Sequence, residues 1–211
     1  MEKTYSLQRA HINAMPASST EDLRINWPYL FTQCGIYAHF GLLTDVNVMQ
    51  VLERSIEQCG RVIVEYFRTQ SSHHDVQAIV SQGLDGDLTF HVVQLLMAHF
   101  GNQIHTLCKW MISIESHVIC QSIQPTFQSG LAAFFAVFYV FNLQYQDEVS
   151  QTLEFIQRRF IGINPDRGSK ATRGKVMSKR TGKVVQKRPA TVNPHVATLL
   201  KKLLDFEWDF V

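Results

Sequence analysis

FQSGLAAFFAVFYVFNLQ, residues 127–144, is the stretch of sequence that decides the fold of this chain. Its apolar residues cover every side of a helix, so a helix here has no face for solvent and is expected to be buried. The aromatic side chains also suit a strand, but the length of the stretch and its three alanines favour a helix. Seven of the fourteen Phe residues lie between Phe127 and Phe160, which places the expected core around this helix.

Patterns on either side of this stretch indicate further helices. Between Asp45 and Arg68 the apolar residues recur at a spacing of three and four, which gives the clearest helical stripe in the chain. Helices are also expected over residues 75–82, over 88–100 after an Asp87 cap, over 147–160, and from Pro194 after an Asn193 cap to about Trp208.

Residues 109–123 have a different character. Apolar residues stand on both sides of Glu115-Ser116-His117, a pattern that is typical of a small β-hairpin. Together with the helices, this hairpin predicts an α+β fold that is mainly helical, a single domain with a small β-hairpin and a long basic loop. We expect a disordered leader over 1–22, a helical α+β core over 23–165, a basic flexible loop over 166–190, and a C-terminal helix within 191–211 that docks on the core.

Composition narrows the class of protein. The longest apolar run, Leu131–Phe141, is too short for a membrane-spanning helix, which needs about 20 residues, so no membrane contact is expected. The N-terminal residues carry scattered charge and do not resemble a signal peptide. The four cysteines are far apart in sequence, a pattern that indicates reduced thiols. We therefore expect an intracellular protein of the cytoplasm or the nucleus, while the sequence leaves its oligomeric state open.

Charge is concentrated in one stretch, residues 167–188, which we call the basic segment. The chain has a formal net charge of +2, but the basic segment alone carries nine Lys or Arg residues and no acid, so the remainder carries a net −7. The candidate partner-binding residues are these nine: Arg167, Lys170, Arg173, Lys175, Lys179, Arg180, Lys183, Lys187 and Arg188.

Three interpretations of the basic segment remain open. It is a solvated loop, a nuclear-import signal around Lys179-Arg180 and Lys187-Arg188, or a binding site for nucleic acid or an acidic protein surface. The segment contains no aromatic residue, so it lacks the stacking platform that proteins use for single-stranded nucleic acid.

No pattern of chemical residues predicts a catalytic, cofactor or metal site. His91 and His99 are eight residues apart on one expected helix, a rise of about 12 Å that is too long for two ligands of one ion. Residues 168–176 resemble a phosphate-binding loop, but five residues separate the two glycines and Val176 replaces the Ser or Thr that holds magnesium. We therefore expect a non-enzymatic intracellular interaction module with a protein partner; the alternative is a nucleic-acid-associated protein that uses the basic segment. An enzyme of unrecognised type remains the third class.

Several short strings in the chain also resemble a known family. They are Trp27-Pro28-Tyr29-Leu30-Phe31, Ala38-His39-Phe40, Thr152-Leu153-Glu154-Phe155-Ile156-Gln157-Arg158, residues 163–170, Val192-Asn193-Pro194-His195 and Asp205-Phe206-Glu207-Trp208. Together they are similar to the C-terminal region of vertebrate proteins like sterile alpha motif domain-containing protein 3, from Trp27 onward. This resemblance implies no active site. The chain departs from the family pattern because no sterile alpha motif precedes Trp27 and because residues 101–109 are shorter than in relatives, which implies a shortened form.

Overall fold

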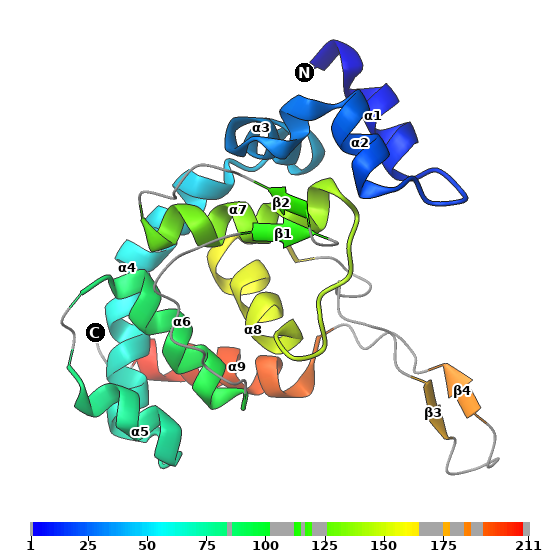
Figure 1. Cartoon of the computed structure of the whole chain (residues 1–211). Coiled ribbons are helices and arrows are strands. Elements are labelled where there is room, and N and C mark those ends of the chain that lie inside the picture. Colours follow the sequence, from blue (N-terminus) through cyan, green and yellow to red (C-terminus); the bar gives the residue numbers. More distant parts are fainter. Residues whose placement is uncertain are drawn as a thin grey trace. The chain divides into compact units, whose positions relative to one another are not determined.

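The structure, a computed structural model, describes residues 2–83, 86–101, 126–164 and 192–208. It also gives the backbone alone of two short strand pairs, β1 (Ile112–Ile114) with β2 (His117–Ile119) and β3 (Lys175–Met177) with β4 (Val184–Gln186). The chain divides into two compact units, which we call unit 1 (Met1–Glu57 and His105–Leu143) and unit 2 (Gln58–Ile104 and Gln144–Val211). Figure 1 shows that helices build both units.

The fold is mainly helical, and the predicted α+β class is wrong. Helices account for 76% of the described part of the chain, and no strand there has described side chains. The hairpin expected over 109–123 therefore adds no sheet layer to the described fold, in which β1 and β2 are three residues each. A two-stranded ribbon of that length has too little surface to form a packed layer, so helices alone make the described core.

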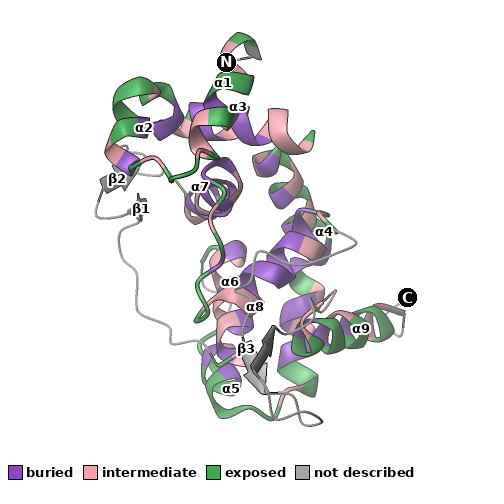
Figure 2. Cartoon of the chain, turned by 90° about the vertical axis from the view of Figure 1, so that its right-hand side faces the viewer, coloured by how far each residue is buried: buried purple, intermediate pink, exposed green. Residues whose placement is uncertain are grey.

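Unit 1 forms around α7 and α3. Its helices are η1 (Glu2–Thr4), α1 (Tyr5–Ile12), α2 (Thr20–Asn26), η2 (Pro28–Phe31), α3 (Gln33–Thr44), the first part of α4 (Val48–Gln70) and α7 (Phe127–Val140). The start of α7 at Phe127 agrees with the sequence, and the Thr126 hydroxyl caps it by accepting from the Ser129 N–H at 3.1 Å. Most of α7 is buried, as Figure 2 shows. The ring of Phe135 in α7 packs edge-on against the ring of Phe40 in α3, with the two ring centroids 6.1 Å apart.

A close approach of backbone fixes the turn between η2 and α3. The Thr32 hydroxyl caps α3 by accepting from the Gly35 N–H at 3.0 Å. A Cβ atom at Gly35 would lie 1.8 Å from the carbonyl oxygen of Tyr29, far inside van der Waals contact. Only glycine therefore fits at this position.

The N-terminal residues differ from the expected disordered leader. Helix α1 occupies Tyr5–Ile12, and α2 begins at Thr20 after a Ser19 cap. The reason is that α1 docks through polar side chains to partners far away in sequence, and a search for apolar periodicity does not register such contacts. Gln8 is the one buried residue of this helix.

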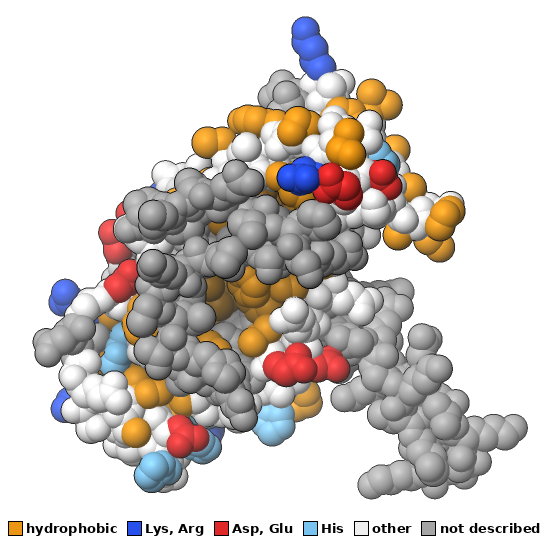
Figure 3. Space-filling model, viewed as in Figure 1, with side chains coloured by type: hydrophobic (Ala, Val, Ile, Leu, Met, Phe, Trp, Pro, Cys, Tyr) orange, Lys and Arg blue, Asp and Glu red, His pale blue; other side chains and the backbone are white. Residues whose placement is uncertain are grey.

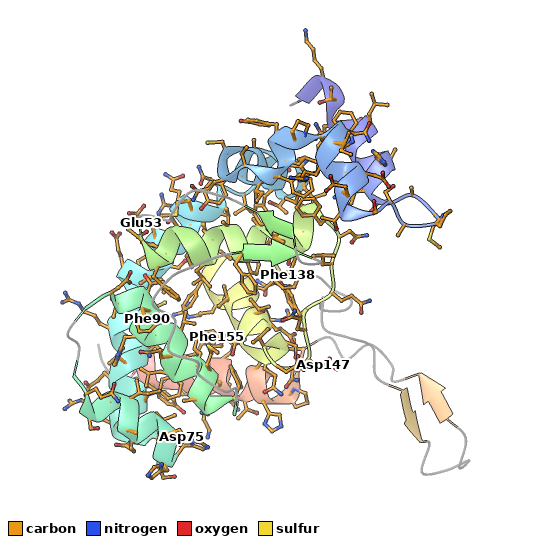
Figure 4. All side chains as sticks on the ribbon, in the orientation of Figure 1. Glu53, Asp75, Phe90, Phe138, Asp147 and Phe155 are labelled. Carbon is orange, nitrogen blue, oxygen red and sulfur yellow. The ribbon has the colours of Figure 1, made fainter. Side chains whose placement is uncertain are left out.

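Unit 2 contains the remaining described helices. They are the second part of α4, α5 (His74–Ser81), α6 (Leu88–His99), α8 (Ser150–Phe155), the π-helical turn η3 (Ile156–Phe160) and α9 (Pro194–Trp208). Phe155 of α8, labelled in Figure 4, is fully buried, and its ring lies 5.6 Å from that of Phe160. Helix α9 starts at Pro194 as predicted, because the Asn193 side chain accepts from the His195 N–H at 2.9 Å.

Two further expectations meet the structure only in part. No helix in the described residues is long and apolar enough to cross a membrane. Neither the exposed Cys34 nor the buried Cys59 forms a disulfide, whereas Cys108 and Cys120 lie outside the described residues. The predicted boundaries of the core and of the basic loop remain predictions.

Candidate functional site at the base of the basic segment

The structure describes where the chain enters and leaves the basic segment. The nine predicted partner-binding residues, from Arg167 to Arg188, lie outside the described residues apart from backbone in β3 and β4. Described residues end at Asn164 before the segment and resume at Val192 after it. Both of these ends are held by one polar cluster in unit 2, which we call the anchor cluster: Glu154, Gln157 and Arg158 of α8 and η3.

The end that leads into the basic segment is held by Gln157 and Arg158. The Gln157 side-chain amide donates to the carbonyl oxygen of Ile163 at 3.0 Å, and the Ile163 N–H donates back to the Gln157 carbonyl at 3.0 Å. The Arg158 guanidinium lies 3.5 Å from the side-chain oxygen of Asn164. Gly162, at a φ of 77°, allows the left-handed turn that brings these groups together.

The end that returns from the segment is held by Glu154. The Asn193 N–H points at both carboxylate oxygens of Glu154, at 3.3 and 3.4 Å. Because Asn193 also caps α9, the same residue fixes the returning chain and starts the last helix. One turn of helix therefore contacts the chain on both sides of the basic segment.

An ion pair links the two halves of the anchor cluster. Arg158 Nε lies 3.1 Å from Glu154 Oε1, and the side chains of Arg158 and Glu154 are 7% and 2% exposed. Burial of a charge costs free energy unless a partner and hydrogen bonds compensate it. Here Asn193 and Asn164 supply such hydrogen bonds. Next to the pair, the buried Gln157 also accepts from the Tyr145 hydroxyl at 2.9 Å.

A second ion pair connects η3 with α9. Arg159 pairs with Glu207, and each side chain is 27% exposed. Within the described residues the Nε atom of Arg159 is buried without a hydrogen-bond partner. Burial raises the pKa of the nearby Cys59 thiol, an effect that the positive charge of Arg159 opposes and the negative charge of Glu207 reinforces.

Two adjacent arginines of the π-helical turn, Arg158 and Arg159, have separate partners. α8 changes from α-helical to π-helical bonding at Ile156, and the Ile161 N–H donates to the Ile156 carbonyl at 3.0 Å. Turns of this kind are short and are frequent at functional sites. Arg158 contacts Glu154 within its own helix, whereas Arg159 reaches Glu207 of α9.

The two histidines considered as metal ligands lie on one helix. His91 and His99 both lie on α6, and burial lowers the pKa of each. His39 is fully buried in unit 1. No group of three or more His, Cys, Asp or Glu residues that could hold an ion is present among the described residues.

Sequence reasoning found the basic segment but missed the anchor cluster. The signal was present in Thr152–Phe160, where Glu154, Gln157 and Arg158 stand at a spacing of three and four among buried apolar residues. Comparison with protein-family models, curated proteins and solved structures gives no match. The resemblance to the sterile alpha motif domain-containing protein 3 group thus stays a prediction.

Proposed function

We propose that this chain is a non-enzymatic intracellular interaction module whose basic segment binds an acidic surface on a partner protein. Two features support the proposal. The first is the charge of the segment, nine cations without an acid in an otherwise acidic chain. The second, which carries the proposal, is the buried anchor cluster, because it holds Asn164 and Asn193 on either side of the segment.

Anchored ends favour binding for an entropic reason. A chain segment fixed at both ends explores less space than a free tail, so less conformational entropy is lost when its charges meet a partner. Opposite charge on the partner raises the association rate and disfavours neutral or basic competitors.

The proposal is tested by titrating the full-length chain with polyglutamate, an acidic polypeptide probe, at several salt concentrations. We expect binding at low salt that weakens as salt rises. A variant with Lys175, Lys179, Arg180 and Lys183 changed to Glu is expected to lose it. A matched control changes four exposed cations of the described surface, Lys3, Arg54, Arg61 and Lys201, to Glu. Equal loss in both variants, or no binding by the wild type, would refute the proposal.

Nucleic acid is the second candidate partner, and the composition of the basic segment favours a backbone contact over base reading. Lys and Arg neutralise phosphates, whereas base reading needs a recognition helix or an aromatic platform. Four or five phosphate contacts predict a log–log salt slope of about −4 on duplex DNA. Tight duplex binding with this slope, together with weak polyglutamate binding, would favour the nucleic-acid alternative.

A further inference from the structure

Helix α1 is too short and too polar to be stable by itself. It has eight residues, and isolated helices shorter than about 12 residues are marginal in water. Its one buried residue is Gln8, whereas Leu7 is 63% exposed. Figure 3 shows hydrophobic side chains at the surface over the N-terminal helices. The position of α1 in unit 1 therefore depends on polar contacts.

Four side-chain contacts hold α1 and the residue after it in place. The side-chain oxygen of Gln8 lies 3.0 Å from Nδ1 of His39 in α3. The Arg9 guanidinium donates to the Val140 carbonyl at the end of α7, at 2.8 Å. The remaining two are the Trp27 indole N–H donating to Nδ1 of His11 at 2.9 Å, and the Asn142 amide donating to the Asn13 side chain at 3.0 Å.

His39 is the contact that acid would break. The residue is fully buried, and within the described part of the chain its Nε2 atom has no hydrogen-bond partner. Burial, and then the positive charge of Arg9, lower the pKa of His39 to about 4. The ring of Tyr5 lies 5.0 Å away. A protonated imidazole here would bury a second positive charge beside Arg9 with one acceptor, Gln8, for its two N–H groups.

No carboxylate of the described helices α1, α3 and α7 compensates that charge. α7 contains no Asp, Glu, Lys, Arg or His. In α3 the titratable groups besides His39 are Cys34 and Tyr37, and the helix has no carboxylate.

We propose that α1 is an acid-released latch, docked on α3 and α7 while His39 is neutral and released when His39 is protonated. The release would open a cavity of about 260 Å³. Thr4 and Gln8 form one wall of this cavity, and residues 26–30 form the other, with Trp27, Pro28 and Tyr29 among them. Departure of α1 removes the first wall and leaves the aromatic wall to solvent.

Amide hydrogen exchange on the full-length chain tests the latch. We expect the opening equilibrium of residues 5–12, corrected for intrinsic exchange, to rise about 20-fold from pH 7 to pH 5. This factor follows from a His39 pKa of about 4 when docked and the ordinary 6.5 when released. His39→Gln is expected to abolish the rise. His74→Gln, at a side chain that is 95% exposed, is the matched control and should retain it.

A second variant keeps the test decisive if His39→Gln does not fold. Gln8→Glu has the same shape but places a carboxylate against His39, which favours the protonated imidazole. Protection of α1 in this variant should then stay constant or increase from pH 7 to pH 5. An unchanged α1 in the wild type across this range, or a Gln8→Glu variant that opens as the wild type does, would overturn the proposal.

Discussion

Unit 1 and unit 2 both bury polar side chains in an apolar core, but they differ in the charge that they bury. In unit 1 the buried contact joins two neutral groups, the amide of Gln8 and the imidazole of His39. In unit 2 it joins two ions, the carboxylate of Glu154 and the guanidinium of Arg158. A neutral contact of this kind is lost when acid adds a charge, whereas an ion pair is most sensitive to removal of one partner.

The largest expected effect is the loss of one member of the buried ion pair. Glu154→Ala leaves the Arg158 guanidinium buried without its carboxylate and should lower the free energy of unfolding by about 3–5 kcal/mol. Urea denaturation of the full-length chain measures it. The double variant Glu154→Leu with Arg158→Met should lose much less, because it removes both charges. If the double variant is as unstable as Glu154→Ala, the ion pair is not the source of the loss.

A smaller effect is expected at the neutral contact of unit 1. His39→Leu leaves the Gln8 side chain buried without its partner and should cost about 1–3 kcal/mol, the usual range for one unsatisfied neutral group. The same denaturation experiment at pH 7 compares it directly with Glu154→Ala. A loss as large as that of Glu154→Ala would remove the distinction between the two units.

Histidine titration gives unit 2 an acid response of its own. Burial lowers the pKa of His99, and the positive charges of His73, Lys202 and His195 lower it further. Because the folded state disfavours the protonated form, stability is lost as the pH falls below the ordinary value of 6.5. His99→Gln should therefore reduce the fall in Tm between pH 7 and pH 5, by roughly 2 °C. Differential scanning calorimetry at the two pH values tests this, and an equal fall in both proteins would contradict it.

The smallest effect is expected at an exposed ion pair. Glu65 and Arg68 are in contact on α4, but the Arg68 side chain is 61% exposed. Water already solvates such groups, so Glu65→Gln should change the Tm by no more than about 1 °C. Thermal unfolding of Glu65→Gln and of Glu154→Ala, measured side by side, compares the loss of an exposed ion pair with the loss of a buried one. A shift of several degrees would mean that exposure does not determine the contribution of an ion pair in this protein.

Local chemistry made several elements predictable from the sequence. The Asp87 carboxylate accepts from the Thr89 and Phe90 N–H groups and starts α6 where expected, as Asn193 does for α9. The docked α1 and the π turn at Ile156 were not predictable. Helix α1 depends on partners far away in sequence, such as the Val140 carbonyl that accepts from Arg9. The π turn depends on backbone hydrogen bonding that differs from that of an α-helix.

The charge of the candidate site was predictable from the sequence, whereas the anchor cluster that holds its two ends was not. A run of nine cations is visible in any reading of the sequence. That Glu154 would be paired with the backbone of Asn193, 39 positions later, is a consequence of the folded arrangement of α8 and α9. The β-hairpin illustrates the opposite error. There, a local pattern of apolar residues over 109–123 was taken as evidence for an α+β fold class.

The anchor cluster also has a consequence for how this chain can change in length. Asn164 and Asn193 are connected through the Arg158–Glu154 pair, so the two described ends of the stretch between them lie within the span of one ion pair. Insertions or deletions between these two residues need not disturb α8 or α9, because neither helix has to move to close a shorter or longer connection. Residues 165–192 are thus the place in unit 2 where related chains are expected to vary most in length, and where a foreign peptide can be inserted.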